Sequence, residues 1–300
     1  MVITSSTIVD ALDANLNTLF QDGVTMWDEE FSQIFNVLSS DKQSEKDSYE
    51  SGFKIMPKKA EGVAATYDTI LPGLTKTYLH ATYALGYEIT EEAVEDNLRT
   101  GETFGKLPDA LVKSAIEAVE VTSANIFNNG FTTAGPDGVS LFNTAHVDLD
   151  GGTQANKPST DADLSVTSLT AGLTTIDGFT GERGLTRPTQ ARMLLIPRQL
   201  WNIADELLSS EFKPYVANNE VNAIQSKELQ YFVNHFLTDE DAWFLLASKE
   251  NHQLKFFWRV KLGALKRGTD FDSTNLKHLA RMRFSVGFSH WMGTYGTSGG

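Results

Sequence analysis

Residues 77–90 read Thr-Tyr-Leu-His-Ala-Thr-Tyr-Ala-Leu-Gly-Tyr-Glu-Ile-Thr, and they alternate between two faces over their whole length. Leu79 and Ile89 fall on one face with the other odd-numbered residues, whereas His80 and Glu88 fall on the other. A period of two is typical of a half-buried β-strand. At about 3.3 Å per residue, one strand here would run roughly 40 Å, far beyond the usual five or six residues. A strand of this length needs a neighbour, from its own chain or from another.

The pattern predicts a long hairpin in which residues 63–70 form the partner strand. Between the two strands lies Leu71-Pro72-Gly73-Leu74, with Pro and Gly at the two central positions that a type II turn favours. A type II turn does not suit the tightest hairpins, so we expect a slightly longer loop that reaches Lys76. The hairpin tip is therefore predicted at Leu71, Pro72, Gly73 and Lys76.

Residues 1–52 lack the pattern of a compact domain. Two short segments carry apolar residues at helical spacing, namely Ile8, Leu12, Leu16 and Leu19, and then Trp27, Phe31, Ile34 and Phe35. A polar run over 39–52 follows them. Two apolar faces separated by a solvated strip suit an arm that packs against another body, and they suit an ordinary pair of surface helices equally well.

A long helix is predicted after the hairpin. Pro108 fits the first helical position, and Gly130 can close the C-terminus. An apolar stripe begins at Leu111, whereas Glu117 and Glu120 are expected to face away from it. Beyond residue 163 the pattern indicates alternating helices and strands. The expected helices are 164–178 and 198–208, and the expected strands are 193–196, 229–235, 242–247, 253–260 and 280–290.

Composition excludes several classes of protein. The 300 residues include no cysteine, so disulfides, thiolate metal sites and cysteine nucleophiles are absent. No stretch of about 18 apolar residues suggests a membrane span, and no secretory signal is recognisable. The formal net charge is −14, from 39 acidic and 25 basic residues. A protein that coats nucleic-acid phosphates needs clustered Lys and Arg, so this charge has the wrong sign.

The chain carries no recognisable catalytic or metal-binding motif. Its six histidines show no zinc spacing, and its carboxylate clusters do not match a calcium loop. Phosphate-binding glycine motifs and the nucleophile elbow are absent, and Gly181-Glu182-Arg183-Gly184 follows a helix instead of joining a strand to one. His146 lies in a predicted loop, which it is expected to order by hydrogen bonding. We therefore predict no catalytic residue, no metal site and no cofactor.

Several blocks, taken in their order and spacing, resemble the major capsid proteins of tailed bacteriophages, nearest the Mu-like major head subunit family. One block is Asp137-Gly138-Val139-Ser140-Leu141-Phe142-Asn143-Thr144-Ala145-His146. The others are 11–23, 87–90 with 96–97, 194–197, 206–210, 217–222, 237–245, 283–288 and 291–296. Together these blocks cover nearly the whole chain.

The resemblance implies an α+β fold of the Hong Kong 97 capsid type. The implied divisions are an N-terminal arm (1–52), an extended β-hairpin loop (53–90), a peripheral domain with a long spine helix (91–133), an axial domain (134–270) and a return strand to the peripheral domain (271–300). In this fold the long hairpin and the arm lie on neighbouring subunits. The hairpin tip at Leu71, Pro72, Gly73 and Lys76 is then expected to lie between subunits.

The resemblance also implies a function and partners. The chain is expected to assemble as hexamers and pentamers into an icosahedral phage head that encloses double-stranded DNA without sequence-specific binding. A separate scaffolding protein, a portal and a decoration protein are the other expected partners, and no membrane is involved. Assembly is expected in the cytoplasm of the bacterial host, and the final location is the virion capsid.

Two other interpretations remain open from sequence. One is a shell of an encapsulin-like compartment, which shares the fold but encloses enzymes. The other is a soluble acidic hydrolase without a recognisable motif. The acidic balance fits an ordinary solubilising surface as well as a container that must not adhere to packaged DNA.

Overall fold

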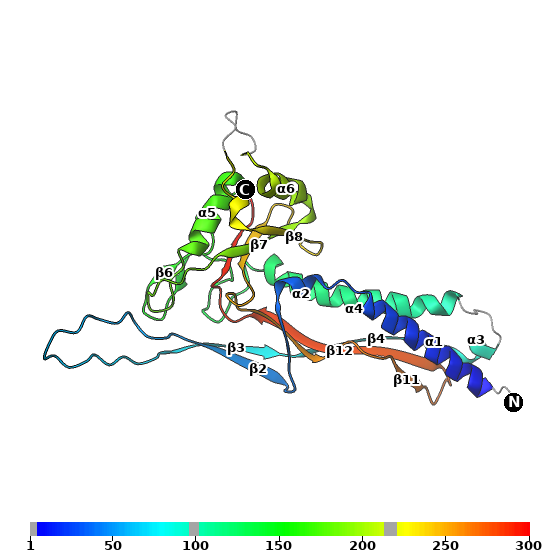
Figure 1. Ribbon diagram of the computed structural model, residues 1–300. Coiled ribbons are helices and arrows are strands. Elements are labelled where there is room, and N and C mark those ends of the chain that lie inside the picture. The colour runs from blue at the N-terminus through cyan, green and yellow to red at the C-terminus, as the bar shows by residue number, and fades with distance from the viewer. Residues whose placement is uncertain (1–4, 96–101, 213–220) are drawn as a thin grey trace.

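A flat layer of one sheet and one long helix forms the elongated lower part of the molecule (Figure 1). The computed structural model describes residues 5–95, 102–212 and 221–300. The sheet follows the order β1-β10-β12-β11, and β4 also pairs with β12. Its strands are β1 (Asn36–Ser39), β4 (Ala81–Ile89), β10 (Leu254–Val260), β11 (Lys266–Thr269) and β12 (Leu276–Phe288). All pairs are antiparallel except β1 with β10.

Helices cover one face of this sheet. The long helix α4 (Glu102–Asn128) lies along β12, and α1 (Ser5–Thr25) lies beside α4. Phe20 of α1 is fully buried against Leu111 and Val112 of α4, and such a ring contributes about 2 kcal/mol by its burial. Two short helices, α2 (Glu30–Ile34) and α3 (Glu91–Glu95), complete this layer.

A second unit stands upright on the layer (Figure 1). Its sheet follows the order β13-β9-β7-β8, and the helices α5 (Val166–Asp177) and α6 (Trp201–Ser209) pack on it. The strands are β7 (Ala191–Pro197), β8 (Gln230–Asn234), β9 (Trp243–Ala247) and β13 (Thr294–Thr297). All five residues of β9 are buried, which suits a strand between two others with both faces covered. Ser165 and Ser168 form a reciprocal capping box that starts α5.

One hydrophobic core joins the upright unit to the layer. Phe142 and Phe244 of the upright unit stack with ring centroids 5.0 Å apart, and Phe127 of α4 lies 5.2 Å from Phe244. The short hairpin of β5 (His146–Val147) and β6 (Thr153–Gln154) and the 3-10 turns Arg198–Leu200 and Gln225–Lys227 complete the elements. Among the described residues, no helix is both long and apolar enough to cross a membrane.

The predicted hairpin is wrong in its pairing. The structure splits residues 77–90 at His80: β3 (Pro72–Leu79) pairs with β2 (Ser44–Glu50), and β4 pairs with β12. Residues 63–70, the expected partner strand, form no strand. Leu71, Pro72, Gly73 and Lys76 are therefore at the base of a longer loop that spans 51–71, and not at a tip. The partner strand is β2, which lies in the range predicted to be the arm. Its residues are polar, and a ribbon that is exposed on both faces needs no alternation of apolar residues.

Other expectations are confirmed, with two corrections. The expected strands at 193–196, 229–235, 242–247, 253–260 and 280–290 correspond to β7, β8, β9, β10 and β12, and the expected helices at 164–178 and 198–208 correspond to α5 and α6. Pro108 lies inside α4 and does not begin it. Glu120, expected to face solvent, is buried.

The five-stranded sheet draws on several of the expected divisions of the chain. It takes β1 from the arm range, β4 from the extended-loop range, β10 and β11 from the axial range and β12 from the return strand. The side chains of Ile8 and Leu12, and residues 96–97 and 217–220 of the resembling blocks, lie outside the described residues.

Candidate assembly site

The most unusual surface of the molecule is the loop of residues 51–71, which we call the extended loop. It projects from the β2–β3 ribbon far beyond the rest of the molecule (Figure 1). Its large apolar side chains face solvent: Met56 is 91% exposed and Tyr67 is 93% exposed, and Phe53, Ile55 and Val63 are also exposed. A contiguous exposed apolar segment of this kind marks an interaction site.

The far part of the extended loop also carries positive charge. Lys54 forms an ion pair with Asp150, and Asp68 forms one with Arg183, so both are matched within the chain. Lys58, Lys59 and Glu61 remain exposed near the end of the loop. The end of the loop is thus basic in a chain whose net charge is −14.

The base of the ribbon is attached firmly to the lower layer. Tyr78 of β3 is buried, and its hydroxyl lies 2.6 Å from the Ser289 hydroxyl. Lys76 extends over the ring of Phe288, with its ammonium 5.6 Å from the centroid, and an ion pair joins Lys255 to Asp47 of β2. Lys76 is therefore engaged within its own chain.

Gly73 marks a close approach of the two strands. A Cβ atom there would lie 1.5 Å from the carbonyl oxygen of Tyr49, so no other residue fits without separating the strands. The pairing register shifts at this point, between Ser48 and Glu50. Pro72 and Gly73, which were predicted to form a turn, therefore lie at the start of β3, where Gly73 allows the close approach to β2.

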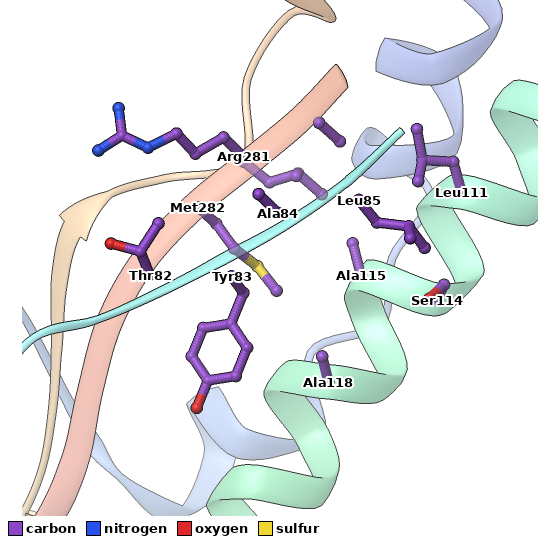
Figure 2. Close-up of a pocket in the computed structure, with 12 residues that line it drawn as sticks. Thr82, Tyr83, Ala84, Leu85, Leu111, Ser114, Ala115, Ala118, Arg281 and Met282 are labelled. Atoms are coloured by element: carbon purple, nitrogen blue, oxygen red, sulfur yellow. The ribbon is translucent and has the colours of Figure 1, made fainter. Parts of the chain in front are cut away.

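A cavity of about 390 Å³ opens between α4 and the strands β4 and β12 (Figure 2). On the helix it is lined by small residues such as Ala115 and Ala118, and on the sheet by Tyr83, Leu85 and Met282. Figure 2 shows Arg281 extending away from the helix. No histidine or carboxylate lines this cavity, so its lining offers no acid–base pair.

His146 orders the loop in which it lies. His146 is fully buried: its Nδ1 lies 2.6 Å from an Asp137 oxygen, its Nε2 lies 3.0 Å from the Asn156 side-chain oxygen, and its ring stacks on Trp291 at 4.5 Å. This confirms the expected ordering role of His146. Within the ranges that the structure describes, no group of three or more potential ligands is arranged to hold a metal ion.

Comparisons with known proteins agree with this geometry. A family model described as phage capsid protein matches residues 73–296. Among solved structures, the procapsid of bacteriophage JBD30 is 15% identical with a TM-score of 0.55, covering 98% of this chain and 76% of that one. The capsid of Cyanophage P-SCSP1u is 10% identical with a TM-score of 0.58, covering 87% of this chain and 85% of that one.

A third similar structure is a virus-like particle from Pyrococcus furiosus, 12% identical with a TM-score of 0.52, covering 95% of this chain and 98% of that one. No curated protein matches the chain. The two-part fold with its projecting ribbon defines the class: a shell-forming subunit of the Hong Kong 97 type. The chain belongs to the phage capsid protein family, and it is a structural major capsid protein of a tailed phage. It is a structural protein and not an enzyme.

Proposed function

We propose that the extended loop joins neighbouring subunits, and that the chain assembles through it as hexamers and pentamers around double-stranded DNA. The observation that carries this proposal is the exposure of the loop's large apolar side chains, led by Met56 and Tyr67. Within the described part of the chain, nothing covers them. In a closed shell, a neighbouring copy covers these side chains in every subunit.

The stability of the ribbon supports the same proposal. An isolated two-stranded ribbon is marginally stable in water. Beyond Glu50 and Pro72 the two legs of the extended loop no longer pair as strands, so the loop lacks even this ladder. Such a segment gains order when it lies on another surface, and burial of its apolar side chains offsets the lost conformational freedom.

Charge favours another copy of the chain as the surface that receives the loop. Lys58 and Lys59 are exposed near the end of the loop, whereas the chain as a whole is strongly acidic. Opposite charges steer association and set its register more than they add affinity. The same acidic balance keeps the shell from adhering to the DNA that it encloses.

Further parts of the proposal rest on the resemblance. They are a separate scaffolding protein, a portal and a decoration protein as partners, assembly in the cytoplasm of the bacterial host, and membership of the Mu-like subfamily. Leu71, Pro72, Gly73 and Lys76 contribute to the subunit contact by holding the base of the loop. The divisions at 52, 90, 133 and 270 remain predicted boundaries.

The test compares two equally exposed aromatic residues. Tyr67→Ser removes a 93% exposed ring from the extended loop, and Phe271→Ser removes a 97% exposed ring from the loop before β12. Neither ring is part of the core, so both variants should melt like the wild type. Electron microscopy of particles from cells expressing each variant should show a loss of closed shells for Tyr67→Ser alone. Normal shells from Tyr67→Ser combined with Met56→Ser would refute the loop's role.

A further inference from the structure

The direction in which the extended loop projects needs a physical cause, because residues 51–71 contain no strand of their own. The legs of the loop contact the Gly181-Glu182-Arg183-Gly184 turn, a motif that the shell function does not otherwise use. This turn belongs to the upright unit, and Arg183 reaches from it to the loop. The Arg183 side chain is only 6% exposed.

One guanidinium holds both legs of the loop. Arg183 Nη1 donates to the carbonyl oxygen of Thr69 at 2.6 Å and to that of Gly52 at 3.3 Å. Its Nη2 donates to an Asp68 carboxylate oxygen at 2.9 Å. Gly52 is on the outgoing leg, whereas Asp68 and Thr69 are on the returning leg. The planar fork of an arginine suits this kind of simultaneous contact.

Asp68 extends the contact across the loop. Its second carboxylate oxygen accepts a hydrogen bond from the backbone N–H of Lys54 at 2.9 Å. The Lys54 ammonium in turn lies 3.2 Å from Asp150 of the upright unit. Two cations and two carboxylates thus alternate across the junction, and they link both legs of the loop to two separate turns of the upright unit.

The turn that presents Arg183 is held by hydrogen bonds of its own. Gly184 has φ +74°, and its N–H donates to the Gly181 carbonyl at 2.9 Å. The neighbouring side chain, Glu182, points into the protein, where it accepts a hydrogen bond from Leu149 N at 2.8 Å and pairs with His290 at 2.6 Å. The buried Glu182 therefore anchors the turn from one side while Arg183 reaches out from the other.

We propose that Arg183 is a positioning residue that fixes the direction of the extended loop relative to the upright unit, so that the loop meets a second copy in the geometry that closes the shell. The inference rests on the proposed function of the loop and adds the residue that controls it. Within the described residues, the contacts of Arg183 and Lys54 are the hydrogen bonds and ion pairs that hold the unpaired legs to the upright unit. Loss of Arg183 frees the returning leg from the upright unit, leaves the outgoing leg held by Lys54 alone, and leaves the ribbon in place.

The ribbon stays in place because its base has separate contacts. Tyr49 of β2 packs on His290 with ring centroids 4.7 Å apart, and its hydroxyl accepts a hydrogen bond from Arg187 at 2.9 Å. Tyr78 is anchored independently by Ser289. A variant at Arg183 should therefore fold and keep its β2–β3 pairing, which makes the role testable apart from folding.

The first test measures loop direction directly. The absence of cysteines allows two spin labels to be placed through Lys59→Cys on the loop and Thr170→Cys on α5. Pulsed electron resonance on the unassembled full-length chain should give one narrow distance distribution. Arg183→Gln should broaden it. It should also speed hydrogen exchange of the Lys54 amide, which donates to Asp68, by about tenfold, as expected for the loss of charged hydrogen bonds.

The matched control is Arg192→Gln, which removes an exposed arginine of the same upright unit that pairs with Glu228 at 2.7 Å. It should leave the distance distribution and the exchange rates unchanged. Asp68→Asn should broaden the distribution partially, and adding it to Arg183→Gln should have little further effect, because the two residues act through one contact. An unchanged, narrow distribution in Arg183→Gln would overturn the inference.

The second test links direction to assembly. Arg183→Gln should reduce the yield of closed shells by about tenfold, with open or irregular particles in their place and an unchanged melting temperature. Arg183→Lys, which keeps the charge but not the fork, should recover part of the yield. Normal shells from Arg183→Gln together with failed shells from Tyr67→Ser would refute the positioning role and leave the loop's proposed function intact. Normal shells from Arg183→Gln and from the Tyr67→Ser and Met56→Ser double variant would refute the proposed function itself.

Discussion

At the scale of single residues, two buried titratable groups oppose each other in their effect on stability. Glu120 of α4 accepts hydrogen bonds from the Trp27 ring N–H at 3.1 Å and from the backbone N–H groups of Glu30 and Phe31 at 3.0 and 2.9 Å. Burial nevertheless raises the pKa of Glu120 to about 7. His252 is buried as well, and burial lowers its pKa to about 4.

The signs of the two contributions follow from linkage. Because the pKa of Glu120 is raised on folding, its contribution is present below about pH 4.5 and is lost as pH rises toward 7. Because the pKa of His252 is lowered, its contribution is present above about pH 6.5 and is lost as pH falls toward 4. Each contribution amounts to at most about 3 kcal/mol. Between about pH 4.5 and 6.5 the free energy of unfolding falls with pH through Glu120 and rises with pH through His252, so the two changes offset each other.

We therefore expect the contributions of Glu120 and His252 to the free energy of unfolding to offset each other between pH 4.5 and 6.5 in the wild type. Glu120→Gln should remove the falling slope, so that stability rises with pH over this range. His252→Asn, which keeps an acceptor for the N–H of Leu254, should remove the rising slope and reverse the trend. Denaturant titrations at several pH values measure all three curves. Identical pH dependence in the three proteins would contradict these assignments.

Glu120 also shows what sequence alone cannot predict about a residue. Its position in the helical pattern placed it opposite the apolar stripe, and that assignment assumed a single buried face. The chain before α2 returns across this second face and buries it. A helix that is covered on two sides cannot be recognised from the period of one stripe.

At the scale of elements, the alternation of residues 77–90 predicted strand correctly but could not show that the strand changes partner. His80 is where the change occurs: its buried ring lies 3.1 Å from the Ser40 hydroxyl and 2.9 Å from that of Ser285. Alternation continues through this point because both halves are extended. The partner of the first half, β2, consists of polar residues, so hydrophobic periodicity gave no sign of it.

Gly73 provides a prediction for the ribbon. Gly73→Ala forces a Cβ against the Tyr49 carbonyl, whereas Gly268→Ala in the exposed strand β11 meets nothing within 4 Å. Overpacking of this kind costs about 1–3 kcal/mol. Hydrogen exchange should therefore accelerate in the amides of β2 and β3 for Gly73→Ala alone. Equal protection of β2 and β3 in the two variants would show that the strands are further apart than in the structure.

At the scale of the whole molecule, the sequence predicted the α+β class and the elements of the upright unit. It could not predict the shared core, because aromatic residues distant in sequence, such as Phe127 and Phe244, meet only when both units are assembled. The extended loop was predicted as an element but misplaced by about ten residues. The base of its legs is held by contacts such as those of Arg183 with Asp68 and Thr69, which have no local signature in sequence.

The exposed apolar side chains of the extended loop are explained by assembly. A single copy leaves Met56 and Tyr67 in water, which favours association. The chain belongs to the phage capsid protein family, and under the proposed function each copy both donates a loop and receives one. The fold is then suited to the formation of closed shells and not to the stability of an isolated subunit.

Negative-stain electron microscopy of the purified full-length protein, expressed alone and with a scaffolding protein, shows whether this chain closes into shells. We expect closed shells of uniform diameter, or hexameric and pentameric rings, in at least one of the two preparations. Only monomers in both preparations would contradict this expectation.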